Sequence, residues 1–445
     1  MKMLGKWPLF LTFFLYGSLA FADKISLTPQ TAVEYALNNN ISLKQEKITL
    51  GSKERDKKYS WNGVSPSASL SATYSSALPS KENSRDTISA GARISATLTP
   101  SLHAQVKNAA LAYEQQEINY ESAKSTISLS VFKNYYEILY EKENLSLCEK
   151  NLETKKKQYK SNLEKFNRGM LNQVDVLSAQ INYQNTELTF ETQKINLESN
   201  IAIFKQTLGI PQNQEIEFSG NFNGLFNFKK ISGESIQMNS PSVALLEKQL
   251  ESARNSLLLN RFKIYGPSLT ASYNYSTTYI ADGFEKSSNG GSLSIGASIP
   301  LDGFMPWSSS SQLINSSKDN IDSIELKLED EKESIRIKSE SLVKKINQCV
   351  DNLKVRKDSI KLAETNYDMT LKAYNYGTRD LLTLQAAQDS LLSSKVNLIA
   401  EANTMVVSIC ELENICGMIP GTLLGENKGI RNLLQLFLYV LQQLL

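Results

Sequence analysis

Four short segments of the chain alternate strictly between apolar and small polar residues, the pattern of a β-strand with one apolar and one polar face. In the first segment Leu70 and Tyr74 belong to the apolar set, and serine or threonine separates its members. The alternation predicts strands over residues 66–77, 87–99, 268–279 and 291–301. The connections within each strand pair, 78–86 and 280–291, are long and polar, so we expect surface loops there.

After each strand pair the chain contains long stretches without glycine or proline, the two residues that interrupt helices. These stretches predict long helices over residues 101–168, 170–208, 307–376 and 378–416. The first and third would extend roughly 100 Å at about 1.5 Å per residue. Apolar residues recur every seven positions in the second and fourth helices: Val174, Ile181, Leu188, Ile195 and Ala202, and then Leu384, Leu391, Leu398, Met405 and Leu412. This repeat favours left-handed coiled-coil packing between the two helices of each hairpin.

The two halves of the chain repeat the same pattern. Pro66 to Tyr74 align with Pro267 to Tyr275, and the helix ends around Gly169 and Gly377 also align. An earlier helix precedes the strands in each half, at about Thr28 to Tyr59 and Ser242 to Phe262. The sequence therefore predicts one structural unit used twice, over residues 23–240 and 241–420, with a linker at 209–240.

The predicted sheet has features of a membrane-spanning barrel. Its polar face is serine, threonine, glycine and asparagine with one charge, Arg93, which suits a water-filled lumen. Strands of about ten residues are long enough to cross a bilayer when tilted. A half-buried sheet in a soluble protein would also alternate, but Tyr74, Tyr275 and Tyr279 lie toward strand ends, where aromatic girdles occur. Four strands are too few to close a barrel, so several copies of the chain would have to contribute.

The ends of the chain have their own composition. Residues 1–22 carry two lysines, an apolar stretch and Ala20-Phe21-Ala22, which predicts a cleaved secretory signal peptide rather than a membrane anchor. At the other end, residues 421–445 form an apolar tail, and its last part, 431–445, is too short to span a bilayer as a helix.

Composition argues against several classes of function. The 48 Lys and Arg nearly balance the 46 Asp and Glu, so no nucleic-acid partner is indicated. His103 is the only histidine, and the cysteines have no metal-binding spacing, so we expect no metal, no cofactor and no enzymatic activity. Cys148 and Cys349 lie at equivalent positions of the two halves. Small buried thiols are favoured there over a disulfide, and pairing of Cys410 with Cys416 stays open.

The tips of the two predicted hairpins are short turns with Gly169 and Gly377 as the residues that end the helices. Positive charge is concentrated before the first tip, at Lys155, Lys156, Lys157, Lys160, Lys165 and Arg168. Two interpretations stay open for this cluster. It is either a docking surface for a partner, with Lys165 and Arg168 as contacts, or a solvated helix end that complements the helix dipole.

The chain resembles the TolC-type outer-membrane efflux channels. The matching segments are Phe166-Asn-Arg-Gly169 with Asp175 following, Tyr374-Asn-Tyr-Gly377-Thr-Arg379, and the early helix from Thr31 to Asn40. The resemblance covers roughly residues 25 to 420 and includes the order of helix, proline, strands and long helices. It implies a mainly α fold with a membrane β-barrel portion, in which a homotrimer builds a twelve-stranded barrel on a twelve-helix α-barrel.

The resemblance also implies location, partners and site residues. It implies a channel in the outer membrane with a periplasmic helical portion, a periplasmic adaptor protein, and an inner-membrane transporter of the RND, ABC or MFS type. In such channels contacts between the hairpins close the tip, and the corresponding residues here are Asp175, Tyr374 and Arg379. Without the resemblance, these three are ordinary residues of a helical turn. The chain departs from relatives that carry acidic rings in the second repeat, because Thr383 and Ala386 occupy those positions. Asp380 is the nearest substitute.

Three functions remain in comparison. An exit duct of a tripartite efflux or type I secretion system accounts for the signal peptide, the repeat, the strands and the helix lengths together. A secreted trimeric coiled-coil adhesin or structural protein accounts only for the helices, and a periplasmic adaptor accounts for a single hairpin. The sequence leaves open the cargo and the transporter class.

Overall fold

The computed structural model describes residues 25–76, 86–219, 228–231, 240–281, 285–418 and 421–423. The predicted signal peptide, nearly all of the first strand-to-strand loop and the tail from residue 424 onward lie outside the described residues.

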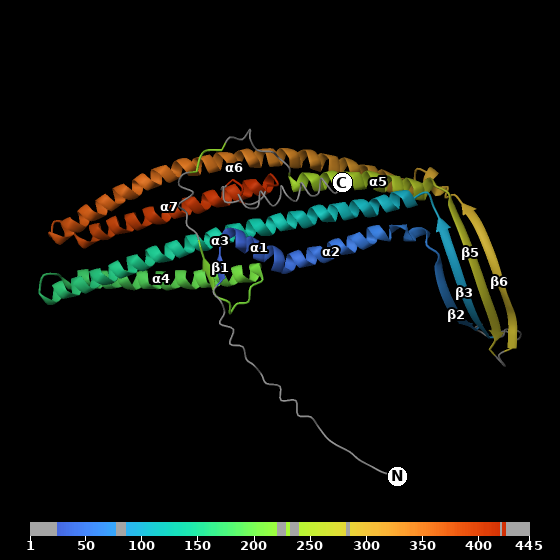
Figure 1. Ribbon diagram of the computed structural model, residues 1–445, viewed down its shortest axis with the longest axis horizontal. Helices are drawn as coiled ribbons and strands as arrows, with labels where there is room; N and C mark the ends of the chain where they lie inside the picture. The colour runs from blue at the N-terminus through green and yellow to red at the C-terminus, as the bar shows by residue number, and fades with distance from the viewer. Residues whose placement is uncertain are drawn as a thin grey trace, which may run out of the picture.

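Four long helices form two hairpins that lie side by side (Figure 1). The first hairpin consists of α3 (Leu102–Asn167) and α4 (Gln173–Leu208), and the second of α6 (Ser309–Asn375) and α7 (Leu381–Ile415). Both tips lie at one end of the elongated molecule and the β-sheet lies at the other. The contact between the hairpins runs mainly between α3 and α7. At about 1.5 Å per residue, α3 and α6 each extend roughly 100 Å.

The returning helices, α4 and α7, reach only about halfway back to the sheet, and shorter helices cover the remaining length (Figure 1). In the first half these are α1 (Pro29–Asn39) and α2 (Ile41–Lys58), and in the second half α5 (Pro241–Tyr265). The order of helix, two strands and two long helices thus occurs twice along the chain.

One sequence prediction is wrong here, because the single early helix expected from Thr28 to Tyr59 is broken at Asn40. The Asn40 backbone leaves the helical region, and its side-chain Oδ1 caps α2 by accepting from the Leu43 N–H at 3.2 Å. Its Nδ2 donates to the carbonyl oxygen of Thr207 at 2.9 Å, close to the end of α4. The break lets the chain turn where α4 ends. Gly209 is required at this junction, because its φ is +71° and an added Cβ would lie 2.9 Å from the Cβ of Asn39.

The sheet contains four antiparallel strands in the order β2-β3-β5-β6. Their bounds are β2 (Ser67–Ser75), β3 (Thr87–Leu98), β5 (Ser268–Ile280) and β6 (Glu285–Ser298). The register places residues of one kind in rows, so that Ala68, Ile94, Tyr273 and Leu293 adjoin, and Ser69, Arg93, Asn274 and Ser292 adjoin in the next row. The alternation in sequence therefore becomes one apolar and one polar face of a continuous sheet.

The last strand differs from the prediction of residues 291–301. It begins at Glu285, within what was expected to be a polar loop, because β5 is long enough to pair with it from Ile280 onward. Residues 285–291 are polar or glycine at every position, so no alternation marks them as strand. The strand ends at Ser298, two residues before Pro300, which lacks the N–H needed for further pairing.

A hydrophobic core lies near the middle of the long helices, where β1 (Ile25–Leu27) pairs in parallel with β4 (Ile216–Phe218) beside α3. Tyr135 of α3 is fully buried and contacts the rings of Phe204 and Phe218. Its hydroxyl lies 2.7 Å from the carbonyl oxygen of Leu27 and 2.6 Å from that of Ser219, and it donates to one of them at a time. The short sheet is thereby attached to the hairpins. The predicted linker 209–240 thus includes a strand that no periodic pattern marked.

The chain after α7 is attached to the same region by Glu413, whose side chain is completely buried. Its carboxyl oxygens accept from the backbone N–H groups of Gly421 at 2.8 Å and Leu423 at 2.7 Å. Burial raises the pKa of this carboxyl to about 7, although the hydrogen bonds to backbone N–H groups act in the opposite direction.

All four cysteines are free and buried. Cys148 of α3 hydrogen-bonds with Gln193 of α4, and Cys349 of α6 hydrogen-bonds with Glu401 of α7, so the two hairpins use corresponding contacts. Burial is the main reason why the pKa of the Cys349 thiol rises to about 11. Such a thiol is not poised to react.

Candidate functional site: the hairpin tips

The two tips have the same backbone geometry. Gly169 and Gly377 both have φ of +73°, in the left-handed region that favours glycine. At the first tip the Gly169 N–H donates to Phe166 O at 2.8 Å, and the next N–H donates to Lys165 O, also at 2.8 Å. The second tip repeats both bonds, at 3.0 and 2.9 Å. This pair of hydrogen bonds is the Schellman motif, which ends each long helix before a short turn.

The helices that follow the tips are capped by side chains. Asn172 Oδ1 accepts from the Asp175 N–H at 2.8 Å, and Asp380 Oδ1 accepts from the Thr383 N–H at 2.9 Å. Asp175 therefore lies in the first turn of α4, where the helix dipole favours a carboxylate. Hydrogen bonds from Thr383 lower the pKa of the Asp380 carboxyl. Asp380 thus serves as a helix cap, and its side chain is exposed, so its part as a substitute for the acidic ring stays a prediction.

Of the three predicted gate residues, Tyr374 makes a side-chain hydrogen bond to the other hairpin. Tyr374 is half-buried, and the Asp175 carboxylate lies close enough to add to the rise in the pKa of its phenol, whose largest cause is burial. The Tyr374 hydroxyl donates to Asn162 Oδ1 at 3.0 Å. Arg379 is exposed, and no ion pair joins it to Asp175 among the residues that the structure describes.

Asn162 is the residue that sequence reasoning missed. It is 1% exposed, and its Nδ2 has no hydrogen-bond partner. The available signal was its spacing, because Cys148, Lys155 and Asn162 recur every seven residues on α3 and all three are buried. Heptad contacts are ordinarily marked by apolar residues, so a polar residue with this spacing gives only a weak signal.

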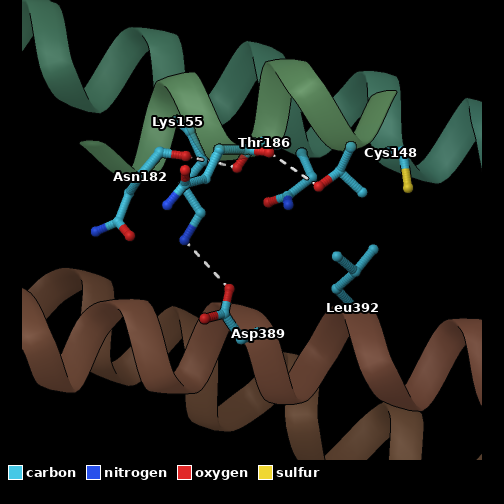
Figure 2. Close-up of a pocket in the computed structure, with 9 residues that line it drawn as sticks. Cys148, Lys155, Asn182, Thr186, Asp389 and Leu392 are labelled. Atoms are coloured by element: carbon cyan, nitrogen blue, oxygen red, sulfur yellow. Dashed lines mark hydrogen bonds and ion pairs between the residues drawn. The ribbon is translucent and has the colours of Figure 1, made fainter. Parts of the chain in front are cut away.

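The positively charged residues before the first tip differ in how far they are buried. Lys155 is only 5% exposed, and its Nζ lies 3.2 Å from Asp389 Oδ1 of α7 (Figure 2). It is therefore part of the contact between the hairpins, and its assignment to an exposed cluster was wrong. The Nζ of Lys165 lies 4.9 Å from the centre of the Tyr374 ring, a cation–π contact. Arg168 is exposed at the end of α3.

Two apolar stripes face away from the hairpin contact. On α4 the predicted coiled-coil residues Val174, Ile181, Leu188 and Ile195 are 56–69% exposed, so this stripe does not pack inside the hairpin as expected. On α6 a stripe with the same seven-residue spacing, Val355, Leu362 and Met369, is 66–73% exposed. By contrast Leu384, Met405 and Leu412 of α7 are fully buried. Each chain therefore presents one uncovered stripe on each of two helices.

The sheet end has further exposed groups of functional interest. Arg93 lies exposed in the polar row between Ser69 and Asn274. Large aromatic side chains, Trp61, Phe304 and Trp307, are exposed where the strands meet the helices, at 53%, 66% and 79%. Aromatic residues of this kind are typical of a membrane–water interface.

Among the described residues no group of His, Cys, Asp or Glu could hold a metal ion. None of the described helices combines the length and the apolar character that a membrane span requires.

The long paired hairpins, their glycine tips and the sheet at the far end define the architecture of TolC-like channels. The chain belongs to the outer membrane efflux protein family, whose model matches residues 32–208 and 233–418. Outer-membrane efflux channels are not enzymes, and the family places this chain in the outer membrane.

Solved structures support the fold. The chain is similar to the CmeC outer membrane channel of Campylobacter jejuni, with 17% identity, a TM-score of 0.72, and coverage of 87% of this chain and 85% of that one. It is also similar to the outer membrane protein VceC of Vibrio cholerae, with 14% identity, a TM-score of 0.68, and coverage of 88% and 96%. It is similar as well to the open state of the MtrE outer membrane channel of Neisseria gonorrhoeae, with 15% identity, a TM-score of 0.61, and coverage of 88% of this chain and 89% of that one. No curated protein sequence matches the chain.

Proposed function

We propose that this chain forms a homotrimeric channel-tunnel, the passive exit duct of a tripartite efflux or type I secretion system. The duplicated unit of each copy contributes four strands to a twelve-stranded barrel and four long helices to a periplasmic α-barrel. The strands would contact outer-membrane lipid, with Arg93 in the lumen. The helices would carry cargo across the periplasm.

The observation that carries this proposal is the incomplete surface of the single chain. β2 and β6 each pair on one side only, and an open edge is not viable in lipid. The uncovered stripes on α4 and α6 have matched seven-residue spacing, as expected if α4 of one copy packs against α6 of the next. Such a head-to-tail contact closes into a ring when the rotation between copies is a simple fraction of a turn.

The tips would be the periplasmic entrance and the place where partners bind. We propose that a periplasmic adaptor contacts Arg168 and Lys165, and that an inner-membrane transporter of the RND, ABC or MFS type supplies the energy. Arg168 is exposed at the very end of α3, which supports its part in this assignment. Lys165 is already in contact with Tyr374, so adaptor binding there would also act on the gate.

Fractionation and electrical recording test the channel. We expect the protein in the outer-membrane fraction, extracted only by detergent, and a purified trimer with low, stable conductance in planar lipid bilayers. A low-resolution image of the trimer should show a tunnel of roughly 100 Å, the length given by the helix rise. A detergent-independent soluble protein, as expected for the secreted coiled-coil alternative, would contradict the proposal.

A second experiment tests the gate residues. We propose that Asp175 and Arg379 close the entrance across the boundary between copies, because no ion pair joins the two among the described residues. Replacing either residue with Ala should raise conductance several-fold, since a partly desolvated ion pair contributes more than the ~0–1 kcal/mol of an exposed one. Lys372→Ala serves as the control, because Lys372 is an exposed residue about one turn before the end of α6. Unchanged conductance in both gate variants would remove Asp175 and Arg379 from the gate.

A further inference from the structure

The part of α3 nearest the tip faces the second hairpin with polar residues at heptad spacing. Asn151, Lys155, Gln158, Asn162 and Lys165 follow one another at intervals of four and three, which are the a and d positions of a coiled coil. In a coiled coil these positions are normally apolar. We call these five residues the polar seam.

Each layer of the polar seam has a partner on the second hairpin. Gln388 of α7 donates to Asn151 at 2.7 Å and accepts from Gln158 at 3.0 Å. Lys155 pairs with Asp389 at 3.2 Å, as Figure 2 shows. Tyr374 of α6 is held by Asn162 through its hydroxyl and by Lys165 through its ring. The contact is thus a ladder of side-chain hydrogen bonds that runs toward the tip.

The polar seam is partly buried and lies beside two open pockets. Lys155 and Asn162 are 5% and 1% exposed, and the other three residues of the polar seam are half-buried. Their partner Gln388 is 7% exposed. Open pockets of about 180 and 210 Å³ lie beside Lys155 and Asn162. Farther from the tip the same two helices meet differently, since Val131 and Ile138 of α3 lie in one core with Met405 and Ile409 of α7. The character of the contact therefore changes along α3 from apolar to polar.

This change has mechanical consequences. An apolar contact resists separation, because parting it exposes apolar surface to water. A hydrogen-bonded contact separates at little net cost, since each group can bond to water instead. Buried polar residues at a positions also select one alignment of the helices over others. The polar seam would set where the tips stand while leaving them able to part.

We propose that the polar seam is a reversible joint between the two hairpins of each chain, and that Asn162 is the positioning residue that holds Tyr374 in the closed tip. This inference rests on the proposed channel function. The unpartnered Nδ2 of Asn162 supports it, because the amide keeps a spare donor for another acceptor when the tips shift. Asn162 is thereby added to the proposed gate residues, which the resemblance limits to Asp175, Tyr374 and Arg379.

Substitutions that break the Asn162–Tyr374 hydrogen bond should raise conductance, and substitutions that make one layer of the polar seam apolar should lower it. Asn162→Ala and Tyr374→Phe each break the same hydrogen bond, so each should raise conductance in planar bilayers several-fold, and the double variant should rise no further. Asn162→Asp keeps an acceptor for the Tyr374 hydroxyl and should retain low conductance. Replacing both partners of one layer by apolar residues, Lys155→Met with Asp389→Leu, should raise the melting temperature or leave it unchanged, and should lower conductance.

Controls separate the joint from general damage. Lys156→Met changes the exposed neighbour of Lys155, and Glu364→Gln breaks an ion pair with Lys395 inside the second hairpin, so neither should alter conductance. Tyr374→Phe removes a single hydroxyl and keeps the ring, so it remains a usable test if Asn162→Ala fails to assemble. Trimer content is checked for every variant by size-exclusion chromatography in detergent.

The outcomes distinguish this inference from the channel function. If Asp175→Ala raises conductance while Asn162→Ala and Tyr374→Phe do not, the channel stands and the joint is refuted. A higher conductance in the apolar double variant would also refute it. If neither the unaltered protein nor any variant forms a pore, the channel function itself fails and the joint fails with it.

Discussion

Replacing Leu188 with glutamate is expected to prevent assembly of the trimer and to abolish conductance. Leu188 is 69% exposed on the α4 stripe, and Leu362 is 73% exposed on the α6 stripe that would face it from the next copy. Burying one leucine side chain contributes about 1.5–3 kcal/mol, and the contact would occur three times in the ring. A buried glutamate reverses this contribution, because an unpaired charge is costly to remove from water.

Light scattering of the detergent-solubilised protein measures the effect directly. Leu188→Glu should give monomers with unchanged helix content, while Lys194→Glu, a change at an exposed polar position of the same helix, should leave the trimer intact. Combining Leu188→Glu with Leu362→Lys should restore part of the trimer by pairing the two charges. A trimer that persists in Leu188→Glu, or a monomeric unaltered protein, would show that these stripes are not the interface.

The second large effect is a pH-dependent stability that depends on Glu413. Its pKa is raised from the ordinary 4.5 to about 7 in the folded chain, so the folded state holds a proton that the unfolded state releases between these values. The stability contributed by the protonated form is therefore fully present below about pH 4.5 and is lost as pH rises through 7. A difference of this size corresponds to roughly 3 kcal/mol per chain.

Thermal unfolding of the protein and of Glu413→Gln between pH 5 and 8 tests this. Other titrating groups are common to both, so the difference between the two melting temperatures isolates Glu413. We expect the unaltered protein to lose stability relative to Glu413→Gln as pH rises, and hydrogen exchange at the Gly421 and Leu423 amides to accelerate beyond its intrinsic pH dependence. If the melting temperatures of the two proteins change with pH in parallel, Glu413 is ionised at all these pH values and its carboxylate is stabilised by the backbone hydrogen bonds.

Most of the secondary structure could be predicted because its causes are local. The absence of glycine and proline predicts long helices, and the structure begins α3 at Leu102 and ends α6 at Asn375, within one or two residues of the expected bounds. The alternation of β2, β3 and β5 depends only on which face is apolar. The first residues of β6 lack this signal, and their strand character comes from pairing with β5. The break at Asn40 likewise depends on a contact with Thr207, distant in sequence.

The candidate site was predictable only in part. Gly169 and Gly377 were recognisable because a left-handed turn favours glycine. Asp175 and Tyr374 came from the resemblance, whereas the hydrogen bond between Tyr374 and Asn162 is visible only in the structure. Lys155 belongs to a charged run in sequence, and only the approach of α7 shows that it is buried against Asp389.

The sequence by itself determined the element types, the repeat and the family, because periodicity and turn residues are properties of neighbouring positions. It did not determine which seven-residue stripe faces inward. Leu384, Met405 and Leu412 of the α7 stripe are buried, whereas the α4 stripe is exposed, although both have the same spacing. Only the tertiary structure decided this, since burial depends on where the partner helix lies. The same reason applies to Asn162, whose role follows from its contact with a tyrosine on the other hairpin.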